Sequence, residues 1–407
     1  MTNPNIVFIM ADDLGFADLS CNGSRHCATP NIDRIAERGV RLRQTYANSA
    51  VCSATRLALI TGRYQYRLPL GLEEPLAGKT DVGLPPEHPT LPSLLRAAGY
   101  GTTLIGKWHL GVLPKFGPER SGYDHFWGIR SGAIDYYSHI NPRGEDDLWD
   151  GETTIHQAGY LTDLLGDKAV GAIEGYARQR QPFLLSLHFN APHWPWEAPG
   201  DEAVSERLTG TRLRHFDGGT LRTYARMVQA MDLQIGRVLQ ALDANRLTDN
   251  TIVIFTSDNG GERFSDTWPF TGIKTELLEG GLRVPGLICW PSRIPAGAVS
   301  DQVAITMDWF ATLLEAAEVA PDPDHPPDGI SLLPVLTSPV PRQLFWRYRL
   351  NRQRAMRDGP FKYLKIRDNT YLFNVVEDPR ERGNLRELRK DVFERMEAEW
   401  HAWNATM

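Results

Sequence analysis

The sequence predicts an α/β protein with a large, mostly parallel sheet flanked by helices on both faces, and a small C-terminal antiparallel sheet packed by one helix. Two observations lead to this prediction. Short apolar, β-branched segments alternate with longer segments of helical period, which is typical of a parallel sheet covered on both faces. A Pro- and Asp-rich stretch at residues 321–334 then precedes a run of short alternating strands. We therefore expect a large domain over residues 1–335 and a small C-terminal α+β subdomain over residues 336–407.

The individual elements follow from the period of the apolar residues. Buried strands are expected in the large domain at residues 6–10, 102–105, 183–189, 251–256 and 287–290. Helices are expected between and after them, at residues 31–38, 91–98, 161–178, 222–245 and 306–319. The first helix has Thr29 as its N-cap, Pro30 in its first turn and Gly39 after its end, as helix boundaries commonly do. The C-terminal subdomain should contain strands at residues 344–350, 354–357, 361–366 and 371–375, followed by a helix at 385–403.

Composition and charge exclude several classes of function. The chain has 407 residues, of which 42% are hydrophobic and 23% charged, an ordinary globular balance. The net charge is -6, from 44 basic and 50 acidic residues, so there is no overall basic field and we expect no nucleic-acid partner. No stretch approaches the roughly 20 apolar residues of a membrane span. The apolar run at the N-terminus is too short for a signal peptide, so we expect a cytoplasmic protein without a membrane partner.

The cysteines suggest neither a metal site of their own nor a disulfide framework. There are four of them, Cys21, Cys27, Cys52 and Cys289, and no Cys-x-x-Cys pair. A bridge between Cys21 and Cys27 is possible, but two free thiols are the favoured interpretation.

Polar side chains follow the ends of four predicted strands. Ligands of open α/β sheets bind beyond the carboxyl ends of the strands, so these side chains should meet at one edge of the sheet. The residues are Asp12 and Asp13 after the first strand, Lys107 and His109 after the second, His193 after the third, and Asp258 and Asn259 after the fourth.

Four of these residues suggest a site for a hard cation. Taken singly, Asp12-Asp13 and Asp258-Asn259 are also ordinary turn sequences. Together they supply side-chain oxygens at two strand ends, which suits calcium first and magnesium second. No zinc-type set of histidines and cysteines accompanies them.

Cys52 and Arg56 suggest an anion site beside the cation. A helix is expected to begin at Cys52, and its free N–H groups favour a tetrahedral anion there. Arg56 lies one turn further on and can reach back toward residue 52. A Cys-x-x-x-Arg pattern alone also fits a buried cysteine and a surface arginine. With the lysines and histidines of the strand ends, however, these residues would bind a sulfate or phosphate group.

Several ordered segments resemble the sulfatase family of the alkaline phosphatase superfamily. Residues 51–63, from Val51-Cys-Ser-Ala-Thr-Arg56 through Leu-Ala-Leu-Ile-Thr-Gly-Arg63, resemble its active-site signature. Residues 99–109 resemble its second signature. Further blocks that look like the family, in family order, lie at residues 5–15, 257–260, 272–285 and 328–334. The resemblance runs from about residue 5 to residue 384, nearly the whole chain.

The resemblance implies a nucleophile that is made after synthesis. In the family, the cysteine at the position of Cys52 is oxidised by a maturation enzyme to formylglycine, an aldehyde whose hydrate attacks sulfate esters. Arg56 would orient and stabilise this hydrate, and Lys107 and Lys274 would hold the sulfate oxygens. Ala54 and Thr55 stand where the commonest family signature has proline and serine, which leaves the efficiency of conversion open.

The resemblance also implies acid–base residues and a metal site. His109 would be the base that breaks down the covalent intermediate, and His193, with Lys274, would assist departure of the leaving group. Asp258 is a plausible base for the attack. The implied calcium ligands are Asp12, Asp13, Asp258, Asn259 and the modified residue 52, with magnesium as the second choice.

The expected activity is hydrolysis of a small-molecule sulfate monoester, of an aryl alcohol or a sugar, through a covalent sulfo-formylglycine intermediate. Two alternatives stay open: a phosphonate monoester or phosphodiester hydrolase that uses the same site, and an inactive relative that only binds an anion. A zinc enzyme of the alkaline phosphatase type is less favoured, because the nucleophile position is neither Ser nor Thr. The aromatic residues at 133–139, with Trp194 and Trp196, form either a stacking wall for the substrate or plain packing.

Overall fold

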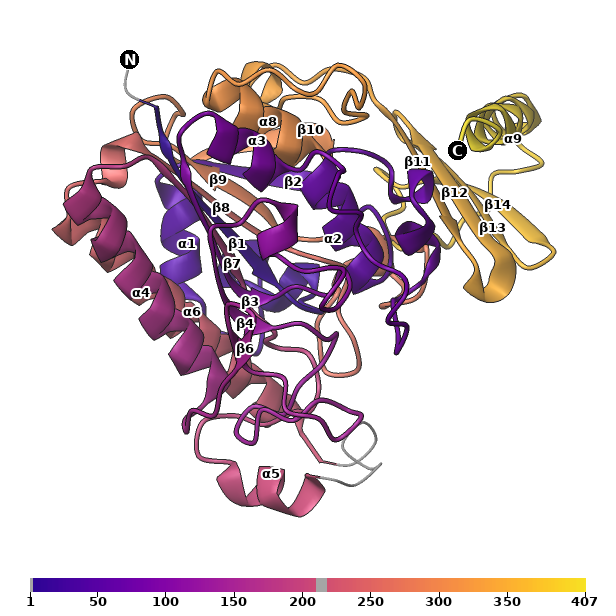
Figure 1. Cartoon of the computed structure of the whole chain (residues 1–407). Coiled ribbons are helices and arrows are strands. Elements are labelled where there is room, and N and C mark those ends of the chain that lie inside the picture. The colour runs from indigo at the N-terminus through magenta and orange to yellow at the C-terminus, as the bar shows by residue number, and fades with distance from the viewer. Residues whose placement is uncertain (1–2, 210–217) are drawn as a thin grey trace.

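The computed structural model describes residues 3–209 and 218–407. Its centre is a ten-stranded sheet with the strand order β10-β2-β9-β8-β1-β7-β3-β4-β5-β6 (Figure 1). The strands are β1 (Asn5–Ala11), β2 (Val40–Tyr46), β3 (Gly101–Lys107), β4 (His125–Ile129), β5 (Trp149–Asp150), β6 (Thr153–Thr154), β7 (Phe183–His188), β8 (Thr251–Ser257), β9 (Gly286–Cys289) and β10 (Ala298–Ile305). The central strands β8, β1, β7, β3 and β4 are parallel, whereas β9 runs antiparallel to both of its neighbours.

Helices cover both faces of this sheet, as the sequence predicts. The helices are α1 (Pro30–Glu37), α2 (Cys52–Thr61), α3 (Leu91–Ala97), α4 (Leu161–Gln179), α5 (Glu202–Leu208), α6 (Leu221–Ala244), α7 (Glu279–Leu282), α8 (Asp308–Ala316) and α9 (Lys390–Asn404). Helices α1, α4 and α6 pack on one face, and α2, α3 and α8 on the other. Strand β1 is buried on both sides: Val7 and Ile9 belong to the first core, Phe8 and Met10 to the second. The predicted fold class is therefore confirmed.

The C-terminal sheet is a four-stranded antiparallel meander. Its strands are β11 (Gln343–Tyr348), β12 (Gln353–Asp358), β13 (Phe361–Ile366) and β14 (Asn369–Asn374). Because side chains alternate along a strand, Tyr363 packs with α9 while its neighbour Leu364 packs with the body of the protein. The body side of this sheet shares its core with Ala54 and Ala58 of α2. The small sheet thus supports the helix that begins at Cys52, while a domain boundary at residue 335 stays a prediction.

Two helix boundaries and several strands differ from the predictions. The last helix begins at Lys390 and not at 385, because the segment before it is bonded to β14: the Leu385 N–H donates to the Leu372 carbonyl, and the Leu372 N–H donates to Asn384 Oδ1. The predicted helix at 306–319 is limited to α8, and Glu318 beyond its end has a positive φ of 56°. Strands β2 and β10 were not predicted, since polar residues interrupt their apolar pattern.

Two further features concern the cysteines and the helices. All four cysteines are free thiols, including Cys21 and Cys27. Within residues 3–209 and 218–407, no helix combines the length and the apolar character that crossing a membrane requires.

Candidate active site

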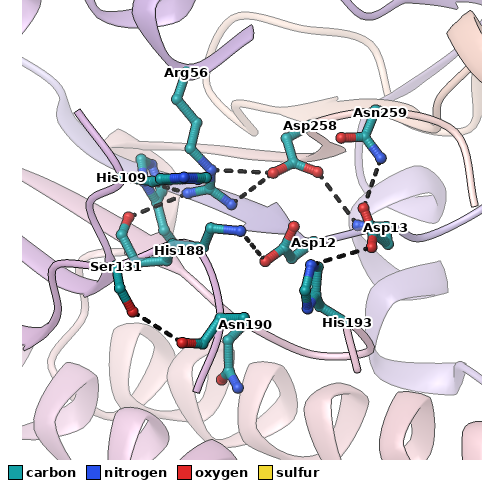
Figure 2. A network of polar contacts seen from close by, with 12 residues as sticks. Asp12, Asp13, Arg56, His109, Ser131, His188, Asn190, His193, Asp258 and Asn259 are labelled. Carbon is teal, nitrogen blue, oxygen red and sulfur yellow. Dashed lines mark hydrogen bonds and ion pairs between the residues drawn. The ribbon is translucent and has the colours of Figure 1, made fainter. Parts of the chain in front are cut away.

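The site lies at the carboxyl edge of the central strands, where the predicted side chains converge (Figure 2). Strands β1 and β8 are in register up to Ala11 and Ser257, so Asp12 and Asp258 leave the sheet side by side. The Asp258 N–H donates to the Ala11 carbonyl, and the Asp13 N–H donates to Asp258 Oδ1. Asp12, Asp13, Asp258 and Asn259 are all at most 2% exposed. The parallel topology therefore creates a buried acidic cluster from two turns that lie about 245 residues apart.

Cys52 is the first residue of α2 and points its sulfur at this cluster. Val51 before it is extended, and the helix begins where Thr55 accepts a hydrogen bond from the Ser49 N–H. The Cys52 Sγ and one carboxylate oxygen each of Asp12 and Asp258 lie within 4.8 Å of one another. A cysteine, a helix N-terminus and two carboxylates thus meet at one buried point.

Arg56 is held rigidly one turn into α2. Its Nε and Nη2 donate to Asp258 Oδ2 at 3.0 and 2.8 Å, and its Nη1 donates to the Lys107 carbonyl at 3.1 Å. The residue is 2% exposed. Two donors on one buried carboxylate oxygen and a third on a carbonyl fix the direction of the guanidinium group. Arg56 is therefore not the surface residue of the alternative interpretation.

The two lysines are each paired with one aspartate. Lys107 Nζ, at the end of β3, lies 2.5 Å from Asp12 Oδ2, and Lys274 Nζ lies 2.7 Å from Asp13 Oδ2. Burial raises the pKa of Asp12 well above its usual range, and the neighbouring Asp258 raises it further against the effect of Lys107. Burial alone would also raise the pKa of Asp13, but Lys274 and His193 hold it below its usual range. The cluster therefore concentrates negative charge that positive groups only partly compensate.

The residues present fit a hard cation at this point. The Oδ1 atoms of Asp12 and Asn259 are buried and, within the described residues, have no hydrogen-bond partner. Buried oxygens of this kind normally bind a proton donor or an ion. Their donor set consists of carboxylate and amide oxygens, which calcium and magnesium prefer.

Both predicted histidines can accept a proton. His109 Nε2–H donates to the Leu76 carbonyl at 2.8 Å, and His193 Nδ1–H donates to the Trp194 carbonyl at 2.7 Å. Burial lowers the pKa of both side chains well below the usual range, with Lys107 acting on His109 and Lys274 on His193. Each neutral ring therefore keeps one nitrogen as an acceptor. For His193 this is Nε2, 3.5 Å from Asp13 Oδ2.

His188 is a site residue that the sequence did not indicate. It ends β7 inside a segment that reads as a core strand, and its Nδ1 lies 3.5 Å from Arg56 Nη1. Burial and the charge of Arg56 lower its pKa well below the usual range. Its place at the carboxyl end of β7, paired with Gly106 of β3, is the feature that could have identified it as a site residue.

Two of the aromatic residues near the site, Tyr136 and Trp196, are packed in the core. Tyr136 is fully buried, and its hydroxyl donates to the carbonyls of Asn190 and His193. Trp196 is 4% exposed and packs edge-on against Phe264. Tyr136 thus fixes the turn that carries His193.

The structure brings together every residue that the sequence predicts for the site. These are Asp12, Asp13, Cys52, Arg56, Lys107, His109, His193, Asp258, Asn259 and Lys274. Their chemical roles stay predictions.

Comparison with known proteins supports the same assignment. The Sulfatase family model matches residues 4–319. The chain is 33% identical over 386 residues to N-acetylgalactosamine-6-sulfatase of Mus musculus, covering 88% of this chain and 71% of the relative. It is 32% identical over 341 residues to mouse arylsulfatase J, covering 81% of this chain and 55% of that one.

A solved structure shares almost the whole fold. The crystal structure of Ps i-CgsB in complex with k-i-k-neocarrahexaose superposes with a TM-score of 0.89 and 30% identity, covering 99% of this chain and 93% of the other. The chain is therefore a member of the sulfatase family and a sulfuric ester hydrolase.

Proposed function

We propose that this protein hydrolyses sulfate monoesters of sugars, with a formylglycine formed from Cys52 as nucleophile and a bound calcium ion. The observation that carries the proposal is the meeting of Cys52, Asp12 and Asp258 at the N-terminus of α2, within 4.8 Å of one another. A separate maturation enzyme would oxidise the cysteine. The modified residue would supply an aldehyde hydrate, one hydroxyl of which attacks sulfur while the other later allows sulfate to leave.

The cations of the site would hold the sulfate group. Lys107 and Lys274 pair with two different aspartates of the acidic cluster, and each lies within hydrogen-bond distance of its partner. Arg56, fixed by Asp258, would orient residue 52. In a buried site, such preorganised positive groups stabilise the charge that develops on the sulfuryl oxygens by several kcal/mol.

The two histidines would transfer protons in two different steps of the reaction, release of sulfate and departure of the alcohol. His109 has Nδ1 buried without a partner among the described residues, so it would accept a proton when sulfate is released. His193 lies beside Asp13, with Lys274 bonded to the same carboxylate, and with a proton on Nε2 it would donate to the departing alcohol.

Asp12, Asp13, Asp258 and Asn259 would hold the calcium ion. The ion would supply positive charge next to residue 52 and the sulfate oxygens. The unpartnered oxygens of Asp12 and Asn259 support this assignment. Magnesium is the second choice, because it demands a stricter geometry.

A sugar sulfate is the substrate class that the relatives favour. N-acetylgalactosamine-6-sulfatase is named for a sulfated sugar, and the Ps i-CgsB structure contains an oligosaccharide. The aryl sulfates that serve as assay substrates would share the reacting group but not the contacts to the sugar.

Rates on matched esters test the proposal. Protein with converted residue 52 should hydrolyse a nitrophenyl sulfate faster than the corresponding phenyl phosphonate or phosphodiester. A preference for the phosphonate or the diester would favour the alternative hydrolase. Binding of all three without turnover would favour the inactive relative.

A further inference from the structure

A cavity of about 580 Å³ opens beside the site, on the loops at one end of the C-terminal sheet. It is lined by Glu74, Tyr348, Arg349, Leu350, Asn351, Arg352, Arg367 and Asp368. The proposed chemistry at residue 52 uses none of these side chains. The position of the cavity and the charge of its wall therefore decide what it can bind.

One wall of the cavity is connected directly to the reacting centre. The segment that carries Glu74 is tied to Ser53, the residue after Cys52: the Ser53 hydroxyl donates to the Glu73 carbonyl and accepts from the Leu76 N–H. The Leu76 carbonyl in turn accepts the hydrogen bond from His109. The same short segment therefore contacts the nucleophile helix, a site histidine and the cavity.

The opposite wall is connected to the loop of Lys274. Gln353 follows the cavity loop, and its side-chain amide donates to the Thr275 carbonyl and accepts from the Leu277 N–H. Burial raises the pKa of Tyr348 to about 12, and the charges of Glu74, Lys274 and Cys52 act on the same phenol. The cavity thus lies at the mouth of the site, between the nucleophile helix and the loop of Lys274.

The cavity wall carries three arginines and two carboxylates, an excess of positive charge. Arg349, Arg352 and Arg367 are exposed, and within residues 3–209 and 218–407 none of them forms an ion pair. The Arg367 guanidinium instead donates twice to Asn351 Oδ1, at 3.1 and 3.0 Å. Of the two carboxylates in the wall, Glu74 accepts the Arg349 N–H at 2.7 Å. Three guanidinium groups beside a site for sulfate esters form a receptor for a further anion.

The backbone of this wall is held in an uncommon conformation. Asn351, Arg352 and Arg367 have positive φ angles of 57°, 48° and 53°. Each such conformation costs a non-glycine residue roughly 1 kcal/mol or more, and it persists where the surroundings enforce it. The Arg367 N–H donates to the Asn351 carbonyl at 2.7 Å, which fixes the two loops together. The Arg352 N–H also donates to the Arg349 carbonyl at 3.0 Å, so backbone hydrogen bonds tie together the residues that carry the arginines.

We propose that this cavity is a substrate subsite that binds a second sulfate group, carried by the sugar next to the one that loses its sulfate. This inference rests on the proposed function, because it takes the reacting sulfate to lie at residue 52. Arg349 and Arg352 bind the second sulfate directly, and Arg367 shapes the wall through Asn351. Leu350, which is 53% exposed, offers an apolar surface to the sugar ring. The preferred substrate is accordingly a multiply sulfated oligosaccharide.

Binding of matched disaccharides tests the subsite independently of catalysis. The probes are a disaccharide with one sulfate on each sugar, the same disaccharide with a single sulfate, and one with a uronate in place of the second sulfate. Calorimetry in a Cys52→Ala background keeps the probes intact. Arg349→Ala and Arg352→Ala should each weaken binding of the doubly sulfated probe about tenfold, and leave the singly sulfated probe within about twofold.

The control is Arg178→Ala, an exposed arginine of α4 on the far side of the molecule from the C-terminal sheet (Figure 1). It should change neither affinity. Equal losses of affinity for both probes in the Arg349→Ala and Arg352→Ala variants, or no loss for either probe, would contradict the proposed subsite. Tight binding of the uronate probe would extend the assignment from sulfate to carboxylate anions. If the unmutated protein with converted residue 52 fails to hydrolyse an aryl sulfate, the proposed function fails, and the binding comparison still decides on the subsite.

Discussion

At the scale of single residues, the site depends on buried charges that fix one another. Arg56 donates three hydrogen bonds, two to Asp258 and one to the carbonyl of Lys107. Lys107 is fully buried and pairs with Asp12. Removing one partner of such a network leaves another charge buried and unpaired, which costs more than the pair itself contributes.

Arg56→Lys should therefore damage both activity and stability. A lysine keeps the positive charge but cannot donate the two hydrogen bonds to Asp258 Oδ2 and also reach the Lys107 carbonyl. We expect kcat to fall on the order of 100-fold, and the free energy of unfolding to fall by about 2–4 kcal/mol. Rates normalised to formylglycine content, together with urea titrations, measure the two effects. Activity within threefold of the unmutated protein would contradict the orienting role, and Arg178→Lys is the matched control.

Metal removal should destabilise the protein. Asp12, Asp13 and Asp258 place three carboxylates in one buried cluster, so a cation that binds only the folded state raises stability. At a calcium concentration about 1,000-fold above Kd, the gain is about 4 kcal/mol, visible as a rise in Tm. Asn259→Ala should largely abolish this rise, whereas Asn369→Ala, on the exposed edge of β14, should not. A Tm that does not respond to chelator and calcium would count against the metal site.

At the scale of elements, helix α2 positions the nucleophile and is itself held by a neighbouring segment. Ser53 bonds both ends of the stretch from Glu73 to Leu76, and Leu76 bonds His109. The C-terminal sheet supports the same helix from the other side through Ala54 and Ala58. Local geometry at residue 52 therefore depends on segments far from it in the sequence.

Ser53→Ala should separate positioning from binding. Without the hydroxyl, the Leu76 N–H loses its acceptor and His109 loses part of its support. We predict a roughly tenfold lower kcat with little change in KM, because a displaced base slows sulfate release and not substrate capture. The comparison is Ser93→Ala, which removes the side-chain acceptor of the Thr90 N–H in the capping box of α3 and should lower Tm without changing kcat. An equal loss of kcat in both variants would show a general effect of instability.

The sequence predicts the strand-end residues well. An apolar strand followed by polar residues indicates that the strand is buried and that the polar residues lie at the carboxyl edge of the sheet. Asp12, Lys107 and Asp258 could be placed in this way. Lys274 could not, since it lies on a loop, and its place followed from the family resemblance alone. His188 was missed because it lies inside a strand, and the cavity was missed because contacts such as Ser53–Leu76 join distant segments. Strand β10, at the edge of the sheet, and its neighbour β2 were missed because polar residues interrupt their apolar pattern.

At the scale of the whole molecule, a buried ionic cluster joins the C-terminal sheet to α7. Lys362 of β13 is fully buried and lies 3.0 Å from Glu279 and 2.9 Å from Glu381. Burial alone would raise the pKa of Glu279, but Lys362 and Arg283 lower it to about 2. Burial, together with the charge of Glu279, raises the pKa of Glu381 to about 7 against the effect of Lys362. Two carboxylates thus share one ammonium group where the two sheets meet.

The raised pKa of Glu381 makes stability depend on pH. The folded state binds the proton more tightly than the unfolded state, so this contribution is complete below about pH 4.5 and is lost as pH rises through about 7. The expected loss is roughly 3 kcal/mol. Glu381→Gln should flatten this part of the profile, measured by urea unfolding between pH 5 and 8. A profile that keeps its slope in the variant would assign the effect to another group.

The central claim is that residue 52 acts as formylglycine and not as a thiol, and mass spectrometry of the tryptic peptide spanning residues 44–56 tests it most directly. The account predicts a fraction of peptide in which the cysteine sulfur is replaced by an aldehyde oxygen, and sulfatase activity proportional to that fraction. A cysteine that stays unmodified after co-expression with a maturation enzyme, in protein that still hydrolyses sulfate esters, would contradict it.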